Sequence, residues 1–119
     1  MNLDSLRAQL LAMPGASEET PFGPDALVYK VGGKMFALVA WEAKPLTVSL
    51  KCDPLHALAL RDEFPAVQPG YHFNKRHWNT VTLDGSVPPP VVDDMIQESY
   101  DLVLAGLSRR RREEILASK

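Results

Sequence analysis

Two adjacent glycines, Gly32 and Gly33, lie between two runs of apolar and β-branched residues, and they constrain the fold more than any other feature of the sequence. The run before them, residues 26–31, alternates along its length, and the run after them, residues 34–41, is almost wholly apolar. Because both central residues of a type I′ turn need a positive φ, the pair predicts a two-residue β-hairpin. The hairpin therefore predicts an antiparallel sheet in the middle of the chain.

Two later runs extend the predicted sheet. Residues 46–51 alternate between an apolar set and a polar set that includes Ser49, which indicates a strand with one buried and one solvated face. Residues 78–83 are rich in β-forming side chains and end at the turn sequence Asp84-Gly85. These two runs become the third and fourth main strands.

Helical spacing of apolar residues predicts a first helix over residues 4–13 and a third helix that follows the three prolines at 88–90. The third helix should end near Gly106, after which Ser108 can cap a short terminal helix. Both long helices therefore have one apolar stripe to bury against the sheet.

A second helix is predicted between the third and fourth strands. Asp53 has the character of an N-cap, and the helix should end before Pro65. Leu55, Leu58 and Phe64 are among the residues that we expect it to bury.

The element order α-β-β-β-α-β-α-α, with short loops between adjacent strands, predicts an α+β fold in which an antiparallel β-sheet meander is packed on one face by helices. With 119 residues, 45% of them hydrophobic and 24% charged, the chain suits one domain over residues 1–119. No repeat or low-complexity tract divides it.

Composition also indicates in which cellular compartment the protein works and which partners it can bind. No apolar run approaches the ~20 residues that span a bilayer, so we expect a cytoplasmic protein without membrane contact. The single Cys52 fits a reducing compartment and excludes an internal disulfide and a thiolate-based zinc site. A net charge of -2 and a pI near 5.9 mean that any contact with nucleic acid must come from a local patch.

Enzyme motifs are missing from the sequence. The glycines near the hairpin lack the spacing of a phosphate-binding loop. Cys52 and His56 are four residues apart and could act as nucleophile and base, but Asp53 and Pro54 place a helix start between them and no oxyanion donors can be identified. A structural Cys52 is favoured, and we expect neither enzymatic activity nor a cofactor.

A metal site can be drawn from His56, His72, His77 and Asp53, because imidazole and carboxylate suit several divalent ions. No two of these histidines stand at the three- or four-residue step that shares a helix face. The spacing therefore favours surface and loop histidines, and we predict no metal site.

Four consecutive arginines, Arg109 to Arg112, admit two interpretations. They could contact nucleic acid, or they could lie on a solvated terminal helix in which Glu113 and Glu114 follow the first two arginines by four residues. Such pairs are worth ~0.3 kcal/mol each. The solvated helix is favoured.

The stretch of residues 71–78 has no consistently apolar face when it is drawn as a regular strand. A loop or bulge around residues 74–76 would let Phe73 and Trp78 pack while Lys75 and Arg76 reach solvent. We therefore predict an irregular loop up to His77 and a regular strand from Trp78 onward.

This loop has parts that suit nucleic acid. Lys75 and Arg76 can contact phosphates, Asn74 and His77 can donate hydrogen bonds, and an aromatic ring can stack on a base. The alternative is an ordinary polar loop whose aromatic residues belong to the core.

Four segments of the chain have a familiar form, namely "PGYHFNKRHWNTV", "VYKVGGKMFALV", "LKCDP" and "ESYDLV". In order and spacing they closely resemble the MmcQ/YjbR family of small bacterial proteins, and they cover nearly the whole chain. The resemblance implies a CyaY-like fold, similar to that of the bacterial frataxin homologue, and a proposed double-wing DNA-binding role. It matches Gly32-Gly33 to a hairpin tip that could serve as a wing, and it matches the family motif to Tyr71, His72, Asn74, Lys75, His77, Trp78 and Asn79.

A frataxin-like fold also raises iron binding, which in frataxin depends on acidic residues along the first helix and the sheet edge. Here the first helix offers only Asp4, with Glu18 and Glu19 after it, so iron binding is not supported.

Three hypotheses follow for function. The first is DNA binding through the residues His72, Asn74, Lys75, Arg76, His77 and Trp78. The second is a protein-interaction or small-ligand-binding domain in which His72, Asn74 and His77 form a pocket wall, and the third is an enzyme that uses the same histidines. If Lys75 and Arg76 converge with the arginine run on one face, the overall negative charge is no objection to DNA; if they do not, that hypothesis weakens.

Overall fold

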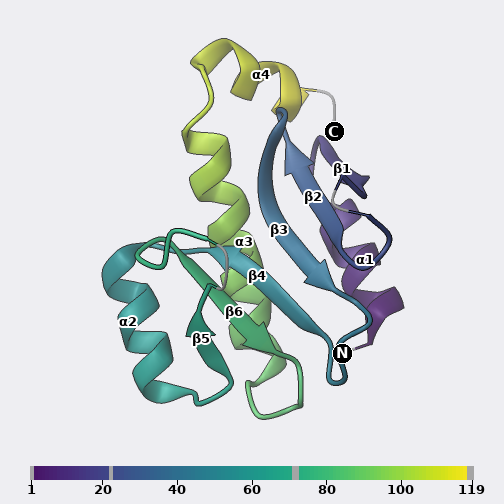
Figure 1. The fold of residues 1–119 in the computed structure, drawn as a ribbon. Helices are drawn as coiled ribbons and strands as arrows, with labels where there is room; N and C mark the ends of the chain where they lie inside the picture. Colours follow the sequence, from purple (N-terminus) through teal and green to yellow (C-terminus); the bar gives the residue numbers. More distant parts are fainter. Residues whose placement is uncertain (1, 22, 71–72, 118–119) are drawn as a thin grey trace.

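A computed structural model describes residues 2–21, 23–70 and 73–117 as helices packed on one antiparallel sheet (Figure 1). The elements in chain order are α1 (Leu3–Leu11), β1 (Ala16–Glu19), β2 (Leu27–Val31), β3 (Lys34–Ala40), β4 (Thr47–Lys51), α2 (Pro54–Glu63), β5 (Val67–Pro69), β6 (Trp78–Thr82), α3 (Pro89–Ala105) and α4 (Arg109–Ala117). The predicted α+β class is confirmed.

The six strands lie in the order β1-β2-β3-β4-β6-β5, and every neighbouring pair is antiparallel. The first four strands form a meander, and the β5–β6 hairpin adds to it with β6 beside β4. The two edge strands, β1 and β5, were not predicted. They have four and three residues, and β1 has the polar sequence ASEE, so neither carries an apolar alternation.

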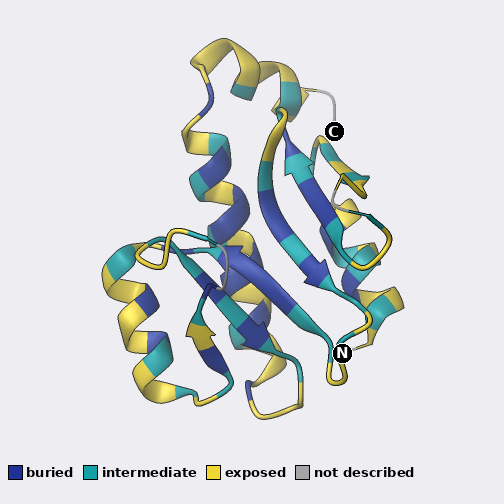
Figure 2. Cartoon of the chain, viewed as in Figure 1, coloured by how far each residue is buried: buried dark blue, intermediate teal, exposed yellow. Residues whose placement is uncertain are grey.

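The core lies between the sheet and two helices. In Figure 1, α1 and α3 lie behind the sheet, and α2 stands beside β5 at its edge. Figure 2 shows buried positions along the central strands and on the inner side of α3. Phe36 of β3 meets Tyr100 of α3 edge to face, with ring centroids 5.5 Å apart, so the centre of α3 packs directly on the sheet. None of the helices in the described part of the chain has both the length and the apolar character to span a bilayer.

The α2 helix begins and ends as predicted but buries a different face. Asp53 caps it by accepting hydrogen bonds from two backbone amides, and it ends at Glu63. The prediction that Leu55 and Leu58 are buried is wrong: their exposed fractions are 79% and 58%. Ala57 and Leu60, three residues apart, form the stripe toward the sheet instead, because the helix packs at the sheet edge where β5 lies.

Ser49 also departs from the prediction of a solvated polar face on its strand. It is buried, and its hydroxyl lies 2.8 Å from the hydroxyl of Thr80, its directly opposed partner on β6. The two hydroxyls form a hydrogen bond with each other, which offsets the cost of removing the Ser49 hydroxyl from water.

The glycine hairpin is confirmed, and one of its glycines also meets the helical layer. Gly32 and Gly33 have φ values of 58° and 81° and connect β2 to β3. A Cβ atom on Gly32 would lie 2.5 Å from Cδ1 of Leu107, whereas one on Gly33 would meet nothing within 4 Å. The hairpin tip therefore rests on the segment between α3 and α4.

Gly32→Ala should lower the free energy of unfolding by about 1–3 kcal/mol more than Gly33→Ala, because both substitutions strain a positive φ but only the first overpacks against Leu107. Urea denaturation of both variants measures the difference. Adding Leu107→Ala to both variants should reduce the difference between their free energies of unfolding. Equal losses of stability in the two single variants would contradict the contact between Gly32 and Leu107.

Candidate functional site

The loop between β5 and β6 carries the predicted site. Two of its residues, Tyr71 and His72, fall outside the described residues, so the prediction for His72 stays a prediction. Asn74, Lys75 and Arg76 are exposed, and the regular strand begins at Trp78. The predicted change from irregular loop to strand is therefore confirmed for the described part.

The loop is folded on itself by local contacts. The Asn74 side chain accepts a hydrogen bond from the Arg76 amide at 3.0 Å, and the Asn74 carbonyl accepts one from the His77 amide at 3.0 Å. Phe73 and Trp78 stack with their ring centroids 4.8 Å apart and 19° between the ring planes. Each ring thus covers one face of the other, and these faces are not open to a base.

Arg61 of α2 fixes the loop from outside. Its guanidinium donates hydrogen bonds to the carbonyls of Lys75 and Trp78, and its Nε donates to the Asn79 side chain at 2.6 Å. Asn79 is fully buried and donates in turn to the Ala57 carbonyl at 3.4 Å. The buried Asn79 amide therefore connects β6 to α2, and Arg61 extends this connection to the loop.

The loop forms a wall between two clefts, and this divides the predicted site. One cleft, of about 470 Å³, is lined by Lys51, Cys52, Asp53, Pro54, Asn74, His77, Trp78 and Leu102. The other, of about 310 Å³, is lined by Pro54, Leu55, Leu58, Arg61, Lys75 and Arg76. The two loop cations thus line a different cleft from Asn74, His77 and Trp78.

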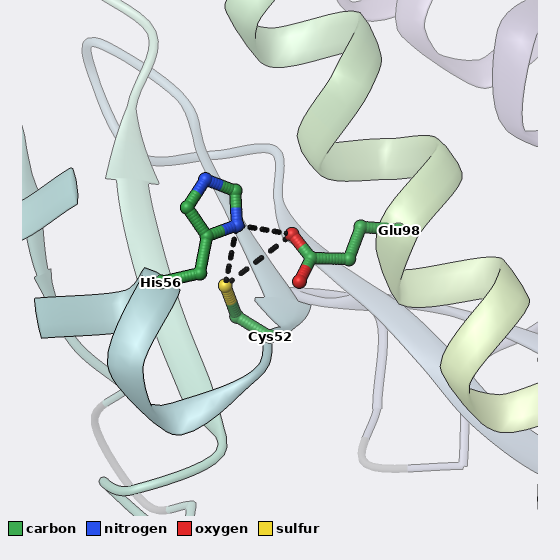
Figure 3. A group of neighbouring side chains, drawn as sticks. All are labelled: Cys52, His56 and Glu98. Carbon is green, nitrogen blue, oxygen red and sulfur yellow. Dashed lines mark hydrogen bonds and ion pairs between the residues drawn. The ribbon is translucent and has the colours of Figure 1, made fainter. Parts of the chain in front are cut away.

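Cys52, which lines the 470 Å³ cleft, belongs to a cluster of three ionisable side chains. Figure 3 shows this cluster. Cys52 follows β4, His56 lies in the first turn of α2, and Glu98 projects from α3. Nδ1 of His56 is 2.6 Å from Oε1 of Glu98, and the Cys52 sulfur is 3.6 Å from the first atom and 3.5 Å from the second. It is the one group of three potential metal ligands found among the described residues.

The Cys52 thiol is held in its protonated form. Burial, and then the carboxylates of Glu98 and Asp53, raise the pKa of Cys52 to about 12. A thiol with this pKa provides almost no thiolate near neutral pH. The arrangement therefore argues against the pairing of Cys52 with His56 as nucleophile and base.

Sequence reasoning missed two residues of this region. It grouped His56 with His72, His77 and Asp53, but the structure brings His56 to Glu98, which is 42 residues further along the chain. No spacing rule relates the two. Arg61 was missed as well, although Asn79 shares its face of the strand with the apolar Val81, which signals a buried amide that needs partners.

The arginine run does not join the loop. Figure 1 shows α4 beyond the far end of α3, close to the β2–β3 hairpin, whereas the loop lies beside the start of α2. Arg109 and Arg110 pair with Glu113 and Glu114 at 3.0 and 3.2 Å, as predicted. The helix buries none of its described residues, as the solvated interpretation predicts. Exposure is common to both interpretations, so nucleic-acid contact by the run stays a prediction.

Two of the three acidic residues considered for iron, Glu18 and Glu19, are engaged in ion pairs. Arg7 binds Glu18 through two hydrogen bonds of 2.8 and 3.0 Å, and Tyr29 donates a third at 2.5 Å. Arg7 holds the pKa of the Glu18 carboxyl below its usual range. Glu19 pairs with Lys30 at 2.9 Å, so both carboxylates already have cationic partners.

Fold and site together define a small α+β protein with one antiparallel sheet and a braced loop between two clefts. The YjbR family model matches residues 11–102. The chain therefore belongs to the YjbR family, and the assignment made from the sequence motifs is confirmed.

Relatives and solved structures agree with this assignment. An Escherichia coli K12 protein described as uncharacterised protein YjbR is 34% identical over 94% of this chain and 95% of its own length. The E. coli O157:H7 protein YbdF, also described as uncharacterised, is 36% identical over 80% of this chain and 78% of its own length. The crystal structure of Deinococcus radiodurans DR2400, a DUF419 domain, superposes with a TM-score of 0.91 at 40% identity, covering 96% of this chain and 87% of that one. A Pseudomonas syringae protein superposes with a TM-score of 0.75 at 25% identity, covering 87% of this chain and 99% of that one.

Arg61→Lys should destabilise the protein by about 1–3 kcal/mol, because one ammonium cannot bind the loop carbonyls and the buried Asn79 amide together. The amide of His77 should exchange faster with solvent, since the loop loses its external anchor. Denaturant unfolding and hydrogen exchange measure the two effects.

Arg76→Ala is the matched control, because the Arg76 side chain is exposed and its removal should not disturb the loop. Its effect on stability should stay within about 0.5 kcal/mol. Equal losses in the two variants would show that Arg61 does not brace the loop.

Proposed function

We propose that the chain is a non-enzymatic, cytoplasmic binding module that contacts DNA through Lys75 and Arg76. The supporting observation is that these adjacent exposed cations sit on a loop whose backbone Arg61 already holds. A loop that is ordered beforehand loses little conformational entropy on binding. Its cations can then contact neighbouring phosphates without reading sequence.

The charge distribution limits the strength of this contact. The arginine run lies elsewhere, and Arg109 and Arg110 are paired with glutamates, so the net charge of -2 still argues against tight DNA binding. Two phosphate contacts give a weak and salt-sensitive interaction. The CyaY-like fold and the double-wing mode implied by the resemblance stay predictions.

Two further points support the non-enzymatic, cytoplasmic part of the proposal. The raised pKa of Cys52 leaves it without the thiolate that nucleophilic catalysis needs. A lone free cysteine suits a reducing compartment.

Binding to duplex DNA should weaken as salt rises, and Lys75→Gln/Arg76→Gln should reduce the slope of log affinity against log salt by about two. Fluorescence anisotropy with a labelled duplex, from low to moderate salt, measures the slope. Arg109→Gln/Arg110→Gln removes the same charge from α4 and should leave the slope unchanged.

The absence of any binding at low salt would rule out DNA as the ligand. An equal change in the two double variants would show that only net charge matters, and would remove the loop from the proposal.

A second candidate function is protein interaction, and the exposed leucines of α2 favour it. Leu55 and Leu58 line the same cleft as Lys75 and Arg76. Large exposed apolar side chains next to cations are typical of protein-binding surfaces rather than of phosphate contacts.

Leu55→Ser/Leu58→Ser should abolish capture of a partner while leaving the DNA salt slope intact. Cross-linking in an extract of the producing cells, followed by mass spectrometry, would compare it with Leu11→Ser/Leu116→Ser, which alters exposed leucines on α1 and α4. A capture profile that is identical for both variants and the unaltered chain would count against this candidate.

A further inference from the structure

We propose that Cys52, His56 and Glu98 bind one Zn²⁺ ion, with three protein ligands and a fourth position for water. This inference does not depend on DNA binding by the loop. A lone cysteine excludes only zinc sites built from several thiolates, so the prediction that the chain has no thiolate-based zinc site is too broad. A mixed site with one sulfur, one nitrogen and one oxygen ligand needs a single cysteine.

The distances between the donor atoms fit a tetrahedral ion. Ordinary zinc–ligand bond lengths place the ligands of a tetrahedral site roughly 3.4–3.6 Å from one another. The Cys52 sulfur already lies 3.6 Å from Nδ1 of His56 and 3.5 Å from Oε1 of Glu98. Only the nitrogen–oxygen separation, now a 2.6 Å hydrogen bond, must lengthen.

The side chain that has to move has room to do so. The His56 side chain is 48% exposed, whereas Cys52 is 3% exposed and fixed. Rotation of the imidazole toward solvent would open the gap by the roughly 0.8 Å that tetrahedral coordination requires. The sulfur can stay where it is.

The rest of the site is held by contacts outside the cluster. The backbone amide of Asp53 donates to Oε2 of Glu98 at 3.2 Å, which orients Oε1 toward the sulfur. The amide of Cys52 donates to the His77 carbonyl at 2.7 Å, so the cysteine backbone is fixed too. Supporting hydrogen bonds of this kind are typical of metal ligands.

Charge and ligand type point to zinc among the divalent ions. A thiolate, a neutral imidazole and a carboxylate carry two negative charges, which one Zn²⁺ neutralises. Binding converts the Cys52 thiol to a thiolate and releases its proton to solvent. The proton of the hydrogen bond between His56 and Glu98 also leaves for solvent while Nε2 takes one up, so that a neutral imidazole presents Nδ1 to the ion. A soft sulfur ligand disfavours Mg²⁺ and Ca²⁺, which prefer oxygen.

The test uses the full chain without a histidine tag, stripped with a chelator that is then removed, and kept reduced with a phosphine instead of a thiol. Isothermal titration with Zn²⁺ should give one ion per chain, and Zn²⁺ should raise the melting temperature. Co²⁺ should produce a thiolate-to-metal charge-transfer band together with the intense visible bands of a tetrahedral site. That charge-transfer band can come only from Cys52, the single cysteine.

Three variants and one control identify the ligands. Cys52→Ser should remove the charge-transfer band. His56→Gln and Glu98→Gln should each weaken Zn²⁺ binding by at least roughly 10-fold, the loss that follows when even a hydrogen-bond partner of a metal ligand is removed. His77→Ala is the control, because His77 lines the adjacent cleft without belonging to the cluster, and it should bind Zn²⁺ as the unaltered chain does.

The proposal is overturned by failure to bind Zn²⁺ in stoichiometric amount, by a Co²⁺ spectrum without the thiolate band, or by unchanged affinity in His56→Gln and Glu98→Gln. Circular dichroism checks that each variant is folded. Should Cys52→Ser fail to fold, the band in the unaltered chain and the two variants of the more exposed ligands still decide the question.

Discussion

The hydroxyl of Ser99 sets how α3 lies on the sheet, and the candidate site depends on that placement. Ser99 is fully buried, donates to the Phe36 carbonyl of β3 at 2.5 Å and accepts from the Lys51 amide of β4 at 2.8 Å. One polar atom thereby fixes the position of α3 against two strands, and a buried hydroxyl with both partners is costly to displace. Since Glu98 precedes Ser99 directly, the same bonds bring its carboxylate to Cys52, one residue beyond Lys51.

The parts of the fold that the sequence predicted are those fixed by local chemistry. The glycine pair needs positive φ whatever surrounds it, and the apolar stripe of α3 needs a surface on which to pack. The Asp53 cap and the pairs between Arg109, Arg110 and their glutamates are equally local, and all of these were found as predicted.

The parts that were missed depend on partners distant in the chain. Leu55 and Leu58 have the spacing of a buried stripe, but only tertiary packing decides which side of α2 meets β5. The strand β1 is stabilised by pairing with β2 and carries no apolar alternation of its own. In the sequence, Glu98 is an ordinary charged residue of an amphipathic helix. Only the packing of α3 on the sheet brings it beside Cys52. The loop motif was recognised correctly. Its alternation in sequence could not show that Lys75 and Arg76 line one cleft while Asn74 and His77 line another.

The position of α2 has a consequence for any ligand at either cleft. The same ten-residue helix carries His56 in its first turn, Leu55 and Leu58 on its outer side, and Arg61 in its last turn against the loop. An occupant of the leucine-lined cleft that shifts this helix would also shift the imidazole relative to Glu98. A ligand in the leucine-lined cleft would then change the affinity of the Cys52–His56–Glu98 cluster for its metal ion. Thermodynamic linkage requires the metal ion to change the affinity of the cleft by the same factor. Among the residues that the structure describes, the linings of the two clefts have only Pro54 in common, the first residue of this helix, so the helix itself connects them.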